Sequence, residues 1–191
     1  MCGQATLCYL EVIQIMRSHN GMRPQDVPIL LKILSLERLN LDWRMKDLAR
    51  ELFISQSEIS ESLNRSYHAQ LIDYYKRRVF RLALYEFTVH AIQYVFPQSP
   101  GPIVRGIRTA HSAPPINKVI RSNEHYVWPD AEGDSRGQAI EPLYPTLVKA
   151  SKQDRFLYAG LALIDALRVG RVREKNIAKE ELEKMILNHW C

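Results

Sequence analysis

Residues 45–71 read MKDLARELFISQSEISESLNRSYHAQL, and this stretch decides the fold of the N-terminal half. Apolar residues recur at helical spacing in two runs, Leu48 with Leu52 and then Ile59 with Leu63. Ser55 and Glu58 have the S-x-x-E spacing of a capping box, which marks a helix start. We therefore predict two helices joined by a tight turn, the second beginning at Ser55.

The second of these helices begins with small, uncharged polar side chains. In a helix-turn-helix, the N-terminal end of the second helix enters the major groove of DNA, where such side chains contact base edges. We assign base contacts to Gln56, Ser57, Ser60 and Asn64, and we place Ser55 at the head of the same DNA-binding surface. The same helical geometry also occurs in domains that bind proteins.

A basic stretch follows these helices. Residues 71–80, LIDYYKRRVF, combine side chains that favour strands with a charged tip, which predicts a small β-hairpin. The net charge is +4 over residues 65–81 but −1 over residues 44–64. Because cations contact phosphates, we assign phosphate contacts to Arg65, Lys76, Arg77 and Arg78. Taken alone, such a basic run is more often a solvated surface.

The segment DLARELFISQSEISESL and the hairpin behind it resemble the core of bacterial winged helix-turn-helix regulators of the MarR-like type. The resemblance covers about residues 25–80. It implies sequence-specific binding of double-stranded DNA and a role in transcriptional regulation. Two features depart from the pattern. Phe53 stands in the turn where glycine is usual, and Glu58 and Glu61 bring negative charge to the recognition helix.

The rest of the chain divides into helical and Pro-rich parts. Helices are predicted around 27–34, over 81–95 and 154–169, and from about 173 to 188. Eight of the ten prolines lie between residues 96 and 150, so we expect an extended segment wrapped over the helical body. One short hairpin is expected around Asp130–Gly133. The predicted fold class is mainly α with a small β-hairpin (α+β).

Four parts are therefore expected along the chain. They are an N-terminal leader (1–22), a winged helix-turn-helix domain with the helix that follows it (23–95), a Pro-rich wrapping segment (96–150) and a C-terminal helical segment (151–191). The apolar leader favours a helix, although its apolar spacing leaves the period open.

Composition agrees with a globular protein. Of the 191 residues, 46% are apolar and 25% are charged, and the net charge of +5 permits nucleic-acid binding. The three cysteines form no disulfide framework, which favours a reducing compartment. No run of about 18 apolar residues is present, and because Glu11 interrupts the apolar start and no basic stretch precedes it, we expect no secretory signal. We expect a cytoplasmic protein that does not associate with membranes.

The sequence holds no pattern typical of catalysis. Its six histidines are scattered without an HExxH motif, and GxSxG, P-loop and GxGxxG patterns are absent. Asp130 and Asp134 fit a turn better than a cation site. We therefore expect no enzymatic activity, no metal site and no cofactor, although a site assembled from distant residues leaves no sequence pattern.

The first functional hypothesis is a homodimeric DNA-binding regulator, because two copies on paired half-sites contact twice as many bases as one copy. The apolar helices at 81–95 and 154–169 are candidate dimer surfaces, and burial in the core accounts for them more simply. The alternative is a protein-interaction module, such as an antitoxin or adaptor whose winged helix holds a partner. Residues 96–150 are a separate candidate contact for a partner protein. Residues 101–122 carry +4 and no acid, which fits a second nucleic-acid contact, an acidic partner or a solvated loop.

Overall fold

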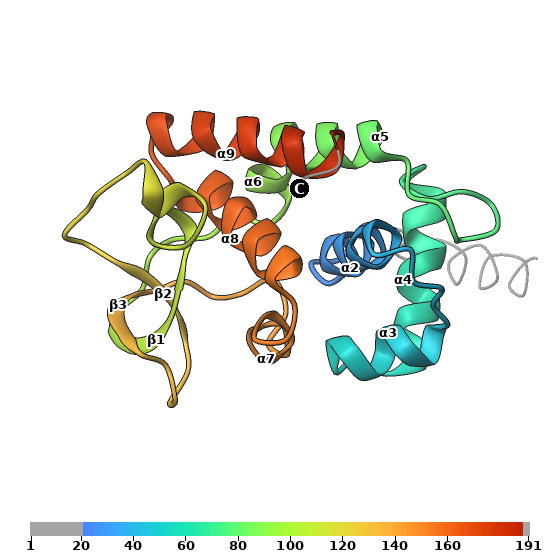
Figure 1. The fold of residues 1–191 in the computed structure, drawn as a ribbon, viewed down its shortest axis with the longest axis horizontal. Helices are drawn as coiled ribbons and strands as arrows, with labels where there is room; N and C mark the ends of the chain where they lie inside the picture. Colours follow the sequence, from blue (N-terminus) through green and yellow to red (C-terminus); the bar gives the residue numbers. More distant parts are fainter. Residues whose placement is uncertain (1–20, 189–191) are drawn as a thin grey trace, which may run out of the picture.

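A computed structural model describes residues 21–188. The N-terminal half contains α2 (Asp26–Arg38), α3 (Met45–Leu52) and α4 (Gln56–His68). Figure 1 shows α4 running beside the end of α2, with α3 below it. The three predicted helices are confirmed here, and α4 begins directly after Ser55, as the capping pattern predicts. The predicted leader lies outside the described residues except for positions 21 and 22.

The C-terminal half is organised around one buried helix. α8 (Arg155–Val169) is buried on almost every side between Phe156 and Leu167, and it packs against α2, α6 and α9. The other helices are α5 (Arg81–Glu86), a π-helical turn η1 (Phe87–Ala91), α6 (Ile92–Val95), α7 (Leu147–Ser151) and α9 (Val172–Ile186). The helices predicted at 81–95, 154–169 and 173–188 are confirmed. Core burial accounts for α8, which therefore offers no free dimer surface.

A small sheet occupies the Pro-rich segment. β1 (Ile103–Thr109) pairs antiparallel with β2 (Tyr126–Pro129) and with β3 (Ser135–Ala139). β2 and β3 pair with each other in parallel, so the three strands close on themselves. Glycine makes this closure possible, because a Cβ atom on Gly106 would lie 1.9 Å from the Trp128 carbonyl oxygen. The sheet lies at one end of the molecule and α3 and α4 at the other (Figure 1).

Two expectations about strands are wrong. The segment 96–150 is not an extended wrap, since it forms this sheet, two 3-10 turns and α7. A turn does exist at Asp130–Gly133, where the Gly133 N–H donates to the Asp130 carbonyl at 3.0 Å. The strands on its two sides run parallel rather than as a hairpin, because both pair with β1. The hairpin predicted at 71–80 is reduced to one antiparallel pair, Ile72 with Val79.

A buried carboxylate attaches the sheet to α8. Asp165 accepts hydrogen bonds from the Thr109 hydroxyl at 2.8 Å and from the Trp128 indole at 2.6 Å. Arg168 also donates to it at 2.8 Å. The Trp128 side chain is only 1% exposed, so it packs on the body of this chain and is not available to a partner.

A second polar network joins the two halves. The Lys32 ammonium of α2 lies 2.8 Å from Asp154 at the start of α8 and 2.7 Å from Glu51 of α3. Asp154 also caps α8 by accepting from the Leu157 N–H at 2.9 Å. Burial alone would raise the pKa of the Asp154 carboxyl, but the hydrogen bonds from Lys32 and Leu157 and the Lys32 charge lower it below its ordinary value. None of the described helices is long and apolar enough to cross a bilayer.

Candidate nucleic-acid interface

Phe53 occupies the position in the turn between α3 and α4 where glycine is usual. Phe53 adopts a left-handed conformation, with φ 55° and ψ 41°. The cost of this conformation for a side chain with a Cβ is about 1–2 kcal/mol. Its ring packs against the core, and the Lys149 ammonium of α7 lies 4.1 Å from the ring centroid. The Thr146 hydroxyl donates to the Leu52 carbonyl at 2.8 Å, so α7 holds this turn from outside.

The N-terminal turn of α4 is exposed and uncharged at its tip. Ser55 accepts a hydrogen bond from the Glu58 N–H at 3.2 Å, and its hydroxyl lies 3.0 Å from that of Ser57. Ser55, Gln56 and Ser57 are all exposed. Only one half of the predicted capping box forms, because the Glu58 carboxylate turns toward other partners. Ser55, Gln56 and Ser57 therefore form an exposed, uncharged polar surface at the start of α4.

The partners of Glu58 neutralise its charge. Its carboxylate accepts from Arg65 at 2.6 Å and from Gln25 at 2.9 Å, and Arg23 lies 3.7 Å away. Burial alone would raise the pKa of the Glu58 carboxyl, but the hydrogen bonds from Arg65 and Gln25 and the nearby positive charges lower it. The repulsion of phosphate expected from Glu58 is thus offset. Glu61 is different, because it is exposed and has no ion-pair partner among the described residues.

Arg65 does not belong to the DNA-facing set, which corrects its assignment to phosphate. The Arg65 side chain is 6% exposed, and its guanidinium forms two hydrogen bonds with the buried Asp26 carboxylate, at 2.9 and 2.7 Å. The hydrogen bonds that Arg65 donates to Asp26 and Glu58 raise the pKa of its guanidinium. The side chain holds α4 to the start of α2, and its burial keeps it from the surface where a phosphate would bind.

The basic loop that follows α4 is anchored at two of its three cations. The Lys76 ammonium donates to the Asn64 side-chain oxygen on α4. The Arg77 guanidinium donates to the Trp43 carbonyl at 2.5 Å and lies 4.6 Å from the Trp43 ring centroid. Arg78 is exposed and its side chain has no partner among the described residues. Lys76 therefore links the loop to α4, Arg77 links it to the segment before α3, and Arg78 is the freest cation.

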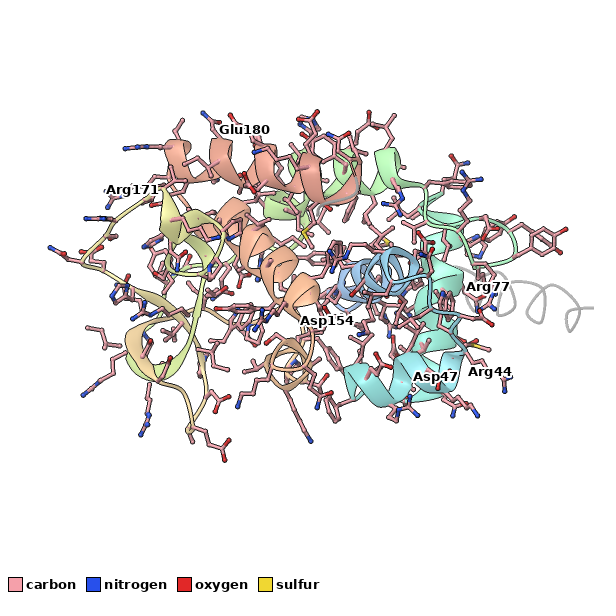
Figure 2. All side chains as sticks on the ribbon, in the orientation of Figure 1. Arg44, Asp47, Arg77, Asp154, Arg171 and Glu180 are labelled. Atoms are coloured by element: carbon pink, nitrogen blue, oxygen red, sulfur yellow. The ribbon has the colours of Figure 1, made fainter. Side chains whose placement is uncertain are left out.

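A cavity of about 310 Å³ brings part of the predicted set together. It lies between the start of α3, the middle of α4 and the basic loop, and its walls include Ser60, Lys76, Arg77, Trp43, Arg44 and Met45. Figure 2 shows Arg44 and Arg77 at the same end of the molecule. Ser55, Gln56, Ser57 and Arg78 do not line this cavity. Of the residues assigned to base contacts, Ser60 therefore lies with the cations Arg44, Lys76 and Arg77, and the exposed tip of α4 lies outside the cavity.

Sequence reasoning missed Arg44. It precedes the first residue of α3, and its N–H donates to Asp47 at 3.0 Å, which leaves the exposed guanidinium available. Arg44 lines the same cavity as Lys76 and Arg77, which lie more than 30 positions later in the sequence. The periodicity of the apolar residues does not report such a neighbourhood.

Metal chemistry finds no support among residues 21–188, which hold no group of three or more His, Cys, Asp or Glu side chains arranged to bind an ion. Comparisons of the chain with protein-family models, with curated proteins and with solved structures gave no match.

Proposed function

We propose that this chain binds double-stranded DNA in a sequence-specific manner and acts as a winged-helix transcriptional regulator. The observation that carries the proposal is the tip of α4. Its exposed, uncharged polar side chains begin the helix whose later residues contact the basic loop, Ser60 through the shared cavity and Asn64 by accepting from Lys76, while cations of this chain pair with the acidic Glu58. In this proposal the tip of α4 enters the major groove, and the basic loop contacts the backbone as a short wing.

The proposed contacts divide into two kinds. Gln56, Ser57 and Ser60 contact base edges, since an exposed glutamine can pair with adenine through both its donor and its acceptor. Asn64 contributes through its amide nitrogen, because its oxygen accepts from Lys76. Phosphate contacts come from Arg78 and from two cations at the cavity, Arg44 and Lys76. Arg77 contributes less, because Trp43 already accepts one of its hydrogen bonds.

The test is selection of bound sequences from random duplex DNA, followed by titration at several salt concentrations. We expect one enriched motif and an affinity that falls steeply with salt, because bound cations release counterions from DNA. Gln56→Ala should relax one base position at a cost of about 1–3 kcal/mol. Arg78→Ala should weaken all sequences alike and lower the slope of log affinity against log salt by about 0.9.

Arg173→Ala is the matched control, because Arg173 is an exposed arginine on α9 and lies outside the proposed interface. It removes the same charge as Arg78→Ala but away from the proposed interface, so it should leave both the enriched motif and the salt slope unchanged. If no motif is enriched, or if Arg78→Ala and Arg173→Ala weaken binding equally, the specific-regulator proposal is wrong.

One observation supports the homodimer that belongs to this proposal. A groove of about 510 Å³ runs between the C-terminal end of α4 and α5, and exposed apolar side chains line it, among them Tyr67, Tyr74, Phe80 and Leu82. In a regulator that binds paired half-sites, a second copy of this chain would cover the groove. Sedimentation of the full chain tests this, since a dimer has twice the mass of 22.2 kDa and Leu82→Lys should dissociate it. A sedimentation mass of one chain would contradict the proposed dimer.

A further inference from the structure

A small pocket at the sheet end of the molecule is lined mainly by hydrogen-bond donors. It has a volume of about 200 Å³. It lies between the end of β1, the turns η2 (Ala110–Ser112) and η3 (Ile116–Lys118), and the loop that leads into β2. We call it the 108–125 pocket, and its polar wall includes Arg108, His111, Ser112, Arg121, Ser122 and His125.

Two arginines and no acidic residue line this pocket, and one of them, Arg108, also lines a neighbouring cavity. Arg108 donates from Nε to the Ser135 hydroxyl at 2.8 Å, which leaves its two terminal nitrogens free to bind. Arg121 is exposed and its side chain has no partner among the described residues. The planar, charged donors of a guanidinium match the oxygens of a phosphate better than those of any uncharged ligand.

The two serines of the wall are set to donate. The Ser112 hydroxyl oxygen accepts the Tyr126 N–H at 3.0 Å, and the Ser122 hydroxyl oxygen accepts the Glu124 N–H at 3.2 Å. Because a backbone donor already occupies each oxygen, the hydroxyl hydrogen remains free for an acceptor. Both serines therefore add neutral donors beside the two arginines.

One of the two histidines provides an independent indication of a site. His111 Nε2 lies 2.9 Å from the Glu124 carbonyl and donates to it. The Nδ1 atoms of His111 and His125 are buried without a hydrogen-bond partner, and they are two of four such side-chain atoms in residues 21–188. Such atoms are uncommon in folded proteins, and both belong to residues of this wall. The Glu174 carboxylate of α9 lies 3.7 Å from His111 Nδ1, beyond hydrogen-bond distance and outside the pocket lining, so His125 carries this indication and His111 does not.

A neighbouring cavity shows what a less suitable site contains. It shares Arg108 but includes the Asp134 carboxylate, which repels anions. Its Lys152 ammonium is already paired with Asp130 at 2.7 Å. The donors of the 108–125 pocket have no such competitor within the lining.

We propose that the 108–125 pocket binds a phosphate group, carried either by inorganic phosphate or by a small phosphomonoester. Its volume is below the range of about 300–1,000 Å³ typical of whole-ligand sites, so it suits the phosphate itself while any remainder projects outward. The pocket and the tip of α4 lie at opposite ends of the molecule (Figure 1). The proposal therefore stands independently of DNA binding.

Calorimetric titration of the full chain with inorganic phosphate, and separately with glycerol phosphate, tests this site. Sodium chloride at equal ionic strength is the reference. We expect saturable binding of at least one probe, and Arg121→Ala should weaken it by about tenfold or more, because a charge-assisted hydrogen bond is lost. Tighter binding of glycerol phosphate identifies a phosphomonoester as the ligand, and tighter binding of inorganic phosphate identifies the free ion.

Arg136→Ala is the matched control, because Arg136 is an exposed arginine on β3 outside the lining. It should change the affinity by less than about twofold. Imidazole resonances of His111 and His125 should shift on binding. Three results overturn the proposal: neither probe binds beyond the chloride reference, Arg136→Ala weakens binding as much as Arg121→Ala, or Arg121→Ala weakens only duplex DNA, which would make the pocket a backbone contact.

Discussion

Replacing Arg65 with alanine separates a structural role of this side chain from a role in DNA contact. The Asp26 carboxylate has no exposed surface and receives two hydrogen bonds from the Arg65 guanidinium. The Arg23 N–H, at 2.7 Å, is the other donor that reaches it within the described part of the chain. Truncation of Arg65 leaves a buried carboxylate with that single donor, and it removes from Glu58 its nearest cation.

The expected loss in the free energy of unfolding is large because a buried carboxylate is left without its cation. Breaking a buried ion pair by removing one partner costs about 3–5 kcal/mol, out of a total stability of about 5–15 kcal/mol. For a chain of this length, the melting temperature should fall by about 6–20 °C. The double variant Asp26→Asn with Arg65→Met removes both charges, so it should lose less than Arg65→Ala alone.

The assay is urea unfolding followed by circular dichroism, paired with DNA titration at a temperature where the variant remains folded. We expect a lower free energy of unfolding and an unchanged salt slope of DNA binding. A free energy within about 1 kcal/mol of the parent, together with a reduced salt slope, would refute the structural role and return Arg65 to the phosphate contacts.

Three further predictions concern the sheet, the polar network and α4. Gly106→Ala places a Cβ 1.9 Å from a backbone oxygen and should cost about 3 kcal/mol in thermal or urea unfolding, whereas Gly101→Ala meets its nearest atom at 3.5 Å and should be nearly neutral. Asp154→Asn should cost about 1–3 kcal/mol at pH 7. Because the folded-state pKa of Asp154 is lowered, this difference between parent and variant should be full above the ordinary pKa of aspartate and shrink as pH falls through and below it; a pH-independent difference would contradict the lowered pKa. Glu61→Gln should tighten DNA binding by up to about fivefold in fluorescence anisotropy at low salt, since it removes an unpaired negative charge, and weaker binding would instead indicate a contact with cytosine.

Local signals in the sequence predicted the helices well. The bounds of α3 and the cap at Ser55 follow from apolar spacing and from one serine, because both depend on residues within a few positions of each other. The exposure of Gln56 and Ser57 follows from the same pattern. Each of these features depends on residues that are close together in the sequence.

The features that were mispredicted depend on distant residues. Arg65 is buried because Asp26 lies 39 positions earlier in the sequence, and a basic residue gives no local sign of such a partner. β1 pairs with residues 17 to 35 positions away in the sequence, and its alternation is interrupted by Gly106. The proline content of this segment indicated that long helices were excluded, but it did not indicate which strands would meet.

The contacts of α7 with the α3–α4 turn limit where the chain can be cut into fragments that keep their structure. Thr146 and Lys149 hold the carbonyl of Leu52 and the ring of Phe53 from a position almost a hundred residues downstream. A fragment ending near residue 95 would lose these two supports, and Phe53 would keep its strained backbone without them. The α3–α4 turn therefore depends on α7 for its geometry. Transferring α3 and α4 to another scaffold would require transferring α7 with them.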